Sequence, residues 1–240
     1  MTDGLAAVLF DMDGLLVDTE PLWLETETEV MARLGAPWTE ADQQALLGGS
    51  MARTVEYLLS KATRALPAQG RATPRRPPEK SLPTPEDIAF WMREGMLERV
   101  AAGRVSVRPG ARELLAAVLA SGVPSALVTS SERAFAEAVL ASTGFRFPVV
   151  VTGDDVTAHK PDPEPYLLAA KLLGADPARC VALEDSPSGV ASAGAAGCLV
   201  VAVPSLLPID PAPGRVVVAS LTGVNMEVLG VLAAQAGISG

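Results

Sequence analysis

Asp11 and Asp13 stand two residues apart, directly after an apolar run that covers residues 5–10. Two carboxylates at the end of a buried strand are costly, so their placement needs a reason. One reason is function, because carboxylate oxygens are the ligands that hard cations such as Mg²⁺ prefer. The other is structural, since the pair can cap a turn in which Gly14 supplies the backbone freedom.

Polar residues that are capable of chemistry also follow three further apolar runs, and they are Thr129 and Ser130, Lys160, and Glu184 and Asp185. In an open parallel sheet, ligands bind outside the carboxyl ends of the strands. We therefore expect one pocket that collects carboxylates, a pair of hydroxyls and an ammonium group.

Each of these groups also has a structural alternative. We expect one of the hydroxyl residues 129–131 to cap the next helix. Lys160 could be an ordinary surface lysine, and the acidic pair 184–185 could lie in a solvated loop before a helix that Ser186 caps. All four groups at the ends of four strands fit such unrelated roles less well than they fit one shared site.

The composition excludes several kinds of site. The 240 residues carry a formal charge of −9, which argues against nucleic acid or an anionic membrane as the main partner. Cys180 and Cys198 are the only cysteines and His159 is the only histidine. A disulfide framework, a zinc site built from Cys and His, and a Ser-His-Asp triad are therefore disfavoured. A bound metal would need oxygen ligands, which favours Mg²⁺.

We expect neither a targeting segment nor a membrane-spanning segment. Its first residues have no basic region, and Asp11 interrupts the first apolar run. The longest uncharged stretch, residues 189–209, contains three glycines and two prolines, so it favours a helix, a turn and a short strand. We expect a soluble protein in the reducing cytoplasm.

The elements that would position these residues form a doubly wound α/β fold. Six short apolar runs predict buried parallel strands, and they cover residues 5–10, 124–128, 149–151, 180–183, 199–203 and 216–218. Helical patterns separate most of them; one starts after Pro109, another follows Ser131, and a third covers 165–173 and stops at Gly174. This alternation predicts a Rossmann-like, doubly wound parallel sheet.

Residues 16–104 break this alternation and predict an inserted helical domain without a convincing strand. One helical pattern begins at Pro21 and ends at Gly35, and two further patterns cover about 53–66 and 86–102. The predicted domains are therefore 1–15 with 105–240, and 16–104. Proline and arginine are frequent between about 67 and 85, so we expect a mobile loop there. Inserted domains in this position commonly act as lids.

Four motifs together carry a family resemblance, and they are Asp11-Met12-Asp13-Gly14-Leu15-Leu16-Val17-Asp18-Thr19-Glu20, Val128-Thr129-Ser130-Ser131, Lys160-Pro161-Asp162-Pro163-Glu164-Pro165-Tyr166 and Leu183-Glu184-Asp185-Ser186. In order and spacing, over nearly the whole chain, they resemble the haloacid dehalogenase-like hydrolase superfamily, in its β-phosphoglucomutase-like phosphatase branch. The resemblance implies a Rossmann-like core, a helical cap after the first strand, Mg²⁺ and phosphoryl transfer.

The resemblance also implies roles for the carboxylates. Asp11 would be the nucleophile that forms an aspartyl-phosphate, and its other oxygen would bind Mg²⁺. Asp13 would protonate the leaving oxygen, later activate water, and bind the metal through its carbonyl. Asp185 would bind Mg²⁺ directly, and Glu184 directly or through a water. A divalent cation and a lysine would relieve the repulsion between a phosphate and an anionic nucleophile.

Phosphate binding would use hydroxyl, ammonium and backbone groups. By resemblance, Thr129 and the backbone N–H of Ser130 would donate to the phosphoryl oxygens, while Lys160 would neutralise both the phosphoryl group and Asp11. The backbone N–H groups of Met12 and of its neighbour at 13 would complete an anion-binding nest.

Residues of the cap should select the substrate, and the candidates by position are Trp23, Ser50, Met51, Arg53 and Thr54. For Trp23, packing within the cap is the favoured alternative. Mutase relatives carry a basic residue directly after the Gly-x-Ser turn of the cap, whereas Met51 stands there in this chain. This departure argues against mutase activity, although Arg53 could substitute.

We therefore expect a Mg²⁺-dependent phosphatase that hydrolyses a small phosphorylated metabolite. A β-phosphoglucomutase-like sugar-phosphate mutase is the alternative enzyme, and a catalytically silent binding or regulatory protein is the alternative of another class. Dehalogenase chemistry would have no use for Asp13 or for a divalent cation. The sequence does not identify the ester, and it shows no defined dimer surface, so a monomer is compatible with it.

Overall fold

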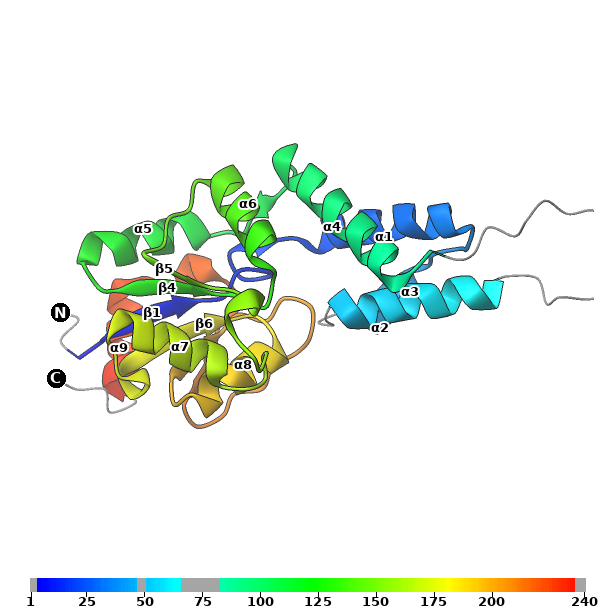
Figure 1. Cartoon of the computed structure of the whole chain (residues 1–240). Coiled ribbons are helices and arrows are strands. Elements are labelled where there is room, and N and C mark those ends of the chain that lie inside the picture. Colours follow the sequence, from blue (N-terminus) through cyan, green and yellow to red (C-terminus); the bar gives the residue numbers. More distant parts are fainter. Residues whose placement is uncertain (1–3, 47–50, 66–82, 236–240) are drawn as a thin grey trace, which may run out of the picture. The chain divides into compact units, whose positions relative to one another are not determined.

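The computed structural model describes residues 4–46, 51–65 and 83–235, and it divides the chain into two compact units (Figure 1). The first, which we call the core unit, comprises Met1–Thr19 and Gly103–Gly240. The second, the helical unit, comprises Glu20–Ala102. The boundaries that the sequence predicts, 15/16 and 104/105, lie four and two residues away from these.

A six-stranded parallel sheet forms the centre of the core unit, with the strand order β5-β4-β1-β6-β7-β8. The strands are β1 (Ala7–Phe10), β4 (Ser125–Val128), β5 (Val149–Val151), β6 (Cys180–Glu184), β7 (Leu199–Ala202) and β8 (Arg215–Val217). All six correspond to the predicted apolar runs, and every residue of β1, β4, β6 and β7 is buried. The predicted α/β class with a doubly wound parallel sheet is confirmed.

The register of the sheet brings three strand ends together. Phe10 of β1 is level with Leu127 of β4 and with Leu183 of β6. Because β1 lies between β4 and β6 and the three strands are parallel, the residues that follow them lie together at the C-terminal end of the sheet. The polar residues that the sequence singles out lie at this C-terminal end of the strands.

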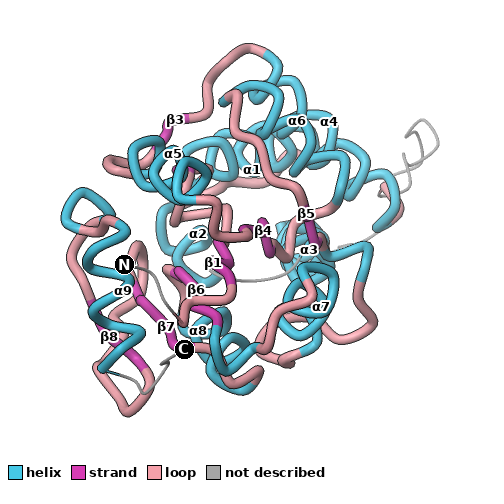
Figure 2. Tube along the Cα trace, turned by 90° about the vertical axis from the view of Figure 1, so that its left-hand side faces the viewer, coloured by secondary structure: helices cyan, strands magenta, loops and turns pink. Residues whose placement is uncertain are grey.

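Helices cover both faces of the sheet (Figures 1 and 2). α7 (Glu164–Leu173) and α8 (Pro187–Ala195) lie on one face, and α5 (Ala111–Ser121) and α6 (Arg133–Thr143) lie on the other. α9 (Met226–Gln235) and three short 3₁₀ helices, Gly153–Asp155, Pro177–Arg179 and Leu221–Gly223, complete the described core unit. Alanines of the strands and of α7 and α8 pack together, which allows a close approach of helix and sheet.

The helical unit contains α1 (Glu20–Leu34), α2 (Glu40–Leu46), α3 (Met51–Ala65) and α4 (Pro85–Ala101). Its core joins α1, α3 and α4 through buried residues such as Met31, Leu58 and Met92. α4 begins with a capping box between Thr84 and Asp87. The sequence did not predict α2, and the mobile loop that it predicts at about 67–85 lies mostly outside the described residues.

One prediction about the insertion is wrong. The sequence indicated no strand between residues 16 and 104, yet β2 (Val17–Asp18) pairs antiparallel with β3 (Ser106–Val107). Two-residue strands are too short to produce a hydrophobic pattern, so periodicity could not reveal them. The ribbon belongs to the core unit, where the chain leaves it and returns to it. Among the described helices, none has both the length and the apolar character that crossing a membrane requires.

Candidate active site

Lys160 bridges two carboxylates at the C-terminal ends of strands β1, β4 and β6. Its Nζ lies 2.7 Å from Asp11 Oδ1 and 2.6 Å from Glu184 Oε1, and it also donates to the carbonyl of Val128 at 2.9 Å. The Lys160 side chain is only 4% exposed, so it is not an ordinary surface lysine. The structure thus brings together residues that are up to 173 positions apart in the sequence (184 − 11).

Three carboxylates form a compact acidic cluster. One oxygen from each of Asp11, Glu184 and Asp185 lies within 4.8 Å of the others, and all three residues are buried. Burial raises the pKa of Asp11 well above its usual range, against the lowering effect of Lys160. Burial and the neighbouring Glu184 raise the pKa of Asp185 to about 7. The cluster therefore holds more negative charge than the one ammonium group compensates.

The cluster fits a hard divalent cation. Asp11 Oδ2 is buried and has no hydrogen-bond partner among the described residues. A buried carboxylate oxygen without a partner is costly, and a cation would satisfy it. The donors are all oxygens, which suits Mg²⁺ and does not suit zinc or copper.

Glu184 is the most heavily hydrogen-bonded of the three carboxylates. Its Oε1 accepts from Lys160 and, at 2.7 Å, from the phenol of Tyr166. Its Oε2 accepts from the backbone N–H of Asp185 at 3.0 Å and from the hydroxyl of Ser186 at 3.2 Å. These contacts tie the side chain to its neighbours, and the role of Glu184 as a metal ligand stays a prediction.

Glu184 also depends on a glycine of α8. A Cβ on Gly189 would lie 1.8 Å from Glu184 Oε1, so any side chain there would displace the carboxylate. Ser186 is the N-cap of α8 and accepts from the backbone N–H of Gly189 at 3.1 Å, as the sequence predicts. The acidic pair before this helix is buried, however, so the alternative of a solvated loop is wrong.

Asp13 lies among hydroxyl groups. Its Oδ1 accepts from Thr19 at 2.8 Å, and its Oδ2 accepts from Ser131 at 2.8 Å and from Thr129 at 3.2 Å. Burial raises the pKa of Asp13, while the three hydroxyls oppose that shift. The side chain is not part of the acidic cluster, and binding of a metal through the Asp13 carbonyl stays a prediction.

The hydroxyls that follow β4 do not cap α6, so the capping alternative is wrong. The N-cap of α6 is Glu132, which makes no capping bond with its side chain, and the first N–H of the helix donates to Asp154 Oδ2 at 2.8 Å. Thr129 and Ser131 donate to Asp13 instead. The Ser130 side chain is exposed, and phosphate binding by its backbone N–H and by that of Met12 stays a prediction.

Asp185 is held by two residues from other loops. Ser205, which follows β7, donates its hydroxyl to Asp185 Oδ2. Gly14 has a φ of +85°, and a Cβ there would lie 2.0 Å from the same oxygen. The turn after Asp13 therefore has to be made by a glycine. The motif thus forms a structural turn and also contributes its carboxylates to the candidate site, so the two alternatives given for it do not exclude each other.

Four residues of the site were not assigned by the sequence, and they are Thr19, Ser131, Tyr166 and Ser205. The first three lie inside the quoted motifs, and Ser205 follows an apolar run that the sequence identified. The rule that found Thr129 could therefore have found Ser205. Tyr166 gives no comparable signal, because it lies on a helix and not at the end of a strand.

The candidate substrate residues belong to the helical unit, and their role is not tested by the structure. Trp23 is half-buried and packs against the core of that unit, as the favoured alternative predicts, and Met51 does the same. Thr54 is buried, Arg53 is exposed and donates to the carbonyl of Ala45 at 2.9 Å, and Ser50 lies outside the described residues.

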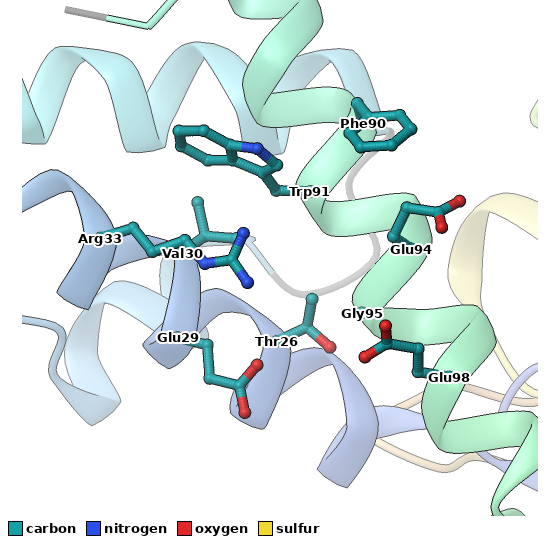
Figure 3. Close-up of a pocket in the computed structure, with 9 residues that line it drawn as sticks. All are labelled: Thr26, Glu29, Val30, Arg33, Phe90, Trp91, Glu94, Gly95 and Glu98. Atoms are coloured by element: carbon teal, nitrogen blue, oxygen red, sulfur yellow. The ribbon is translucent and has the colours of Figure 1, made fainter.

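The helical unit also contains a groove of about 210 Å³ between α1 and α4 (Figure 3). Its walls include the aromatic side chains of Phe90 and Trp91 and the carboxylates of Glu94 and Glu98. The guanidinium of Arg33 lies 5.5 Å from the centre of the Trp91 ring. None of the residues predicted to do chemistry lines this groove.

Known proteins are similar to this chain in sequence and in fold. A family model described as haloacid dehalogenase-like hydrolase matches residues 8–203. Protein CbbY of Rhodobacter capsulatus is 36% identical over 213 residues, which cover 84% of this chain and 86% of that protein. Hexitol phosphatase B of Escherichia coli (strain K12) is 30% identical over 210 residues, which cover 84% of each.

A similar solved structure is that of CbbY from Rhodobacter sphaeroides in complex with phosphate. It has a TM-score of 0.73 and 28% identity, and the match covers 91% of this chain and 95% of that one. A mutant of the same protein was solved in complex with xylulose-(1,5)bisphosphate, with a TM-score of 0.73, 27% identity and the same coverage.

Proposed function

The chain belongs to the haloacid dehalogenase-like hydrolase family, and on that premise we propose that it is a Mg²⁺-dependent phosphatase of a small phosphorylated carbohydrate or similar monoester. The proposed reaction proceeds through an aspartyl-phosphate on Asp11. The observation that supports it most directly is the pairing of Asp11 with Lys160 in an acidic cluster where Asp11 Oδ2 is buried and, in the described part of the chain, has no hydrogen-bond partner.

The proposed role of Asp11 is nucleophilic. A phosphate ester and a carboxylate repel each other, and Lys160 reduces that repulsion by holding a positive charge 2.7 Å from Asp11 Oδ1. Asp11, Asp185 and the Asp13 carbonyl would hold Mg²⁺, with Glu184 as a direct or water-mediated ligand. The cation, when bound, supplies charge neutralisation at the phosphoryl oxygens.

Asp13 is the proposed proton donor and acceptor. A carboxyl group with a raised pKa retains a proton for transfer, and three hydroxyls orient it here. As Asp11 attacks phosphorus, the bond from phosphorus to the ester oxygen breaks, and the proton of Asp13 moves to that oxygen. A water then attacks the phosphoryl group and gives a proton to Asp13, which releases phosphate and restores the Asp11 carboxylate.

The proposed phosphate-binding groups are Thr129, the backbone N–H groups of Ser130 and Met12, and Lys160. The proposed substrate class, a sugar or polyol phosphate, is supported by relatives that are named for such activity or were solved with a sugar bisphosphate. Trp23, Ser50, Met51, Arg53 and Thr54 are proposed to select the substrate. The proposed location is the cytoplasm.

The test is a screen of sugar, polyol and other small phosphate esters for release of inorganic phosphate with Mg²⁺, with chelator as the control. We expect at least one ester to be hydrolysed, and Asp11→Asn to lower kcat/KM by about 10³-fold or more while the protein stays folded. Asp210→Asn is the matched control, because Asp210 is exposed and outside the site. No release from any ester, or an Asp11→Asn variant as active as the control, would contradict the proposal. Isomerisation of a sugar phosphate without release of phosphate would instead indicate the mutase.

A further inference from the structure

All three N–H donors of Lys160 are committed to protein groups. They donate to Asp11 Oδ1, to Glu184 Oε1 and to the carbonyl of Val128 at 2.6–2.9 Å. An ammonium group has no fourth donor. The proposed function requires Lys160 to donate to a phosphoryl oxygen. Lys160 can do so only if it gives up one of these three bonds.

The two charged acceptors of Lys160 differ in what remains after such a change. Asp11 Oδ1 has no other donor among the described residues, so losing Lys160 would leave a second buried oxygen of Asp11 without a partner. Glu184 Oε1 keeps the phenol of Tyr166, which donates to it at 2.7 Å. Because a buried carboxylate oxygen without a donor is costly, Glu184 is the one of these two charged acceptors that Lys160 can release at the lower cost.

Tyr166 is well fixed for this role. It is fully buried on α7 and packs in the hydrophobic core of the sheet with Leu9 and Val128. Its ring centre lies 5.0 Å from Lys160 Nζ, a distance at which the ring stabilises the ammonium group.

We propose that Tyr166 is a positioning residue: by keeping Glu184 Oε1 hydrogen-bonded, it allows Lys160 to turn one N–H from Glu184 to a phosphoryl oxygen while Lys160 stays bound to Asp11. This inference rests on the proposed function, because it assumes that the site receives a phosphoryl group. No covalent bond changes in the step, and only the acceptor of one N–H is exchanged.

The test compares the two tyrosines of the chain. Tyr166→Phe removes the phenol but keeps the ring, and Tyr57→Phe is the matched control, because the Tyr57 phenol donates to the buried Asp42 of the helical unit at 2.9 Å. The measurement is the dissociation constant of inorganic phosphate by calorimetry with Mg²⁺, together with kcat and KM on an ester from the screen. We expect Tyr166→Phe to weaken phosphate binding about tenfold and Tyr57→Phe to leave it unchanged.

A loss of packing alone would not depend on Lys160, so a double-mutant cycle separates the two explanations. In a Lys160→Met background, Tyr166→Phe should weaken phosphate binding no further, since no donor remains to be exchanged. Circular dichroism checks that each variant is folded. If Lys160→Met does not fold, the single variants still test the inference, because equal phosphate affinity of Tyr166→Phe and Tyr57→Phe would overturn it.

The outcomes distinguish this inference from the proposed function. Equal phosphate affinity of the wild type and Tyr166→Phe, in a chain that hydrolyses an ester, overturns only the inference. An undiminished effect of Tyr166→Phe in the Lys160→Met background overturns it as well. Wild-type protein that hydrolyses no ester, but binds phosphate in a manner that depends on Tyr166, overturns the proposed function and supports the role of Tyr166.

Discussion

Both units of the molecule bury a carboxylate that accepts from a tyrosine and pairs with a lysine. In the helical unit, Asp42 accepts from Tyr57 and Thr39 and forms an ion pair with Lys61. In the core unit, Glu184 accepts from Tyr166 and from Lys160. The side-chain types are the same, but Lys160 is shared with Asp11, and Asp185 is adjacent. Among the described residues, Asp42 is the one carboxylate that pairs with Lys61.

The pKa values follow this difference in charge balance. The hydrogen bonds from Lys61, Thr39 and Tyr57 outweigh burial and hold the pKa of Asp42 well below its usual range. In the core unit, burial outweighs the single lysine, and the pKa of Asp11 and of Asp185 is raised. One ammonium per carboxylate stabilises a fold, whereas a surplus of carboxylates keeps unfavourable charge that a cationic ligand can relieve.

The largest effect should come from displacing the carboxylate that Lys160 and Tyr166 share. Gly189→Ala places a Cβ 1.8 Å from Glu184 Oε1, and Glu184 cannot move without breaking its bonds to Lys160 and Tyr166. We expect kcat/KM to fall about 100-fold and the free energy of unfolding to fall by about 2–3 kcal/mol. Enzyme kinetics and urea denaturation measure the two.

Gly194→Ala is the control for this change, because Gly194 lies on the same helix α8 and a Cβ there would meet none of the described residues within 4 Å. We expect unchanged kcat/KM and a gain of about 0.5–1 kcal/mol, since alanine is the better helix former. Equal activity of the two alanine variants would show that the position of Glu184 does not matter for the reaction.

The corresponding change in the helical unit should affect stability and not activity. Asp42→Asn removes the charge that pairs with Lys61, and we expect the free energy of unfolding at pH 7 to fall by about 1–2 kcal/mol. Because the pKa of Asp42 is lower in the folded state than in the unfolded chain, its contribution is complete above the unfolded value of 3.8 and is lost as the pH falls below it. The difference between wild type and variant should therefore begin to shrink as the pH falls below 3.8.

Thermal and urea denaturation from pH 3 to pH 8 measure this, with Glu40→Gln, an exposed glutamate of α2, as the control. A loss of activity without a loss of stability in Asp42→Asn would place Asp42 with the carboxylates of the core unit and break the comparison.

The sequence predicts the strands well because each is a continuous apolar run, and β1, β4, β6 and β7 are buried along their whole length. It does not predict β2 and β3, whose pairing over two residues leaves no pattern, or α2, which has only seven residues and buries Asp42 and Leu46. In α2 the buried Asp42 accepts from Thr39, three residues before it, and from Tyr57 of α3; the contact with α3 is the part that no local pattern reveals.

The same limit applies to the candidate site. The register of a parallel sheet makes the position of Asp11 and Glu184 predictable, since Asp11 follows β1 and Glu184 ends the neighbouring strand β6. Which hydroxyl meets which carboxylate depends on turns and rotamers, so Ser131 was not distinguished from Ser130. Tyr166 approaches the site from α7, 18 residues from Glu184 in the sequence, and only the packed structure shows that contact.

Glu27 offers the sharpest test of whether charge balance, and not the unit, decides this behaviour. It lies on α1 of the helical unit and is 3% exposed, and its Oε2 has no hydrogen-bond partner among the described residues. Burial, with a smaller effect of Glu20, raises its pKa to about 7. Glu27 therefore resembles the core carboxylates although it belongs to the other unit.

Glu27→Gln should stabilise the protein by about 1 kcal/mol at pH 8, a gain limited by the amide N–H donors that then lack acceptors. Because the folded pKa is raised, the folded state of the wild type holds a proton that the unfolded chain loses near pH 4.5, so its stability falls as the pH rises from about 4.5 to about 7. The advantage of the variant should grow across that window and then level off. Glu98→Gln, an exposed glutamate of α4, is the control and should change the free energy of unfolding by less than about 0.5 kcal/mol. A variant that is less stable than the wild type at pH 8 would mean that Glu27 has a partner that compensates its charge. Uncompensated buried carboxylates would then be confined to the core unit.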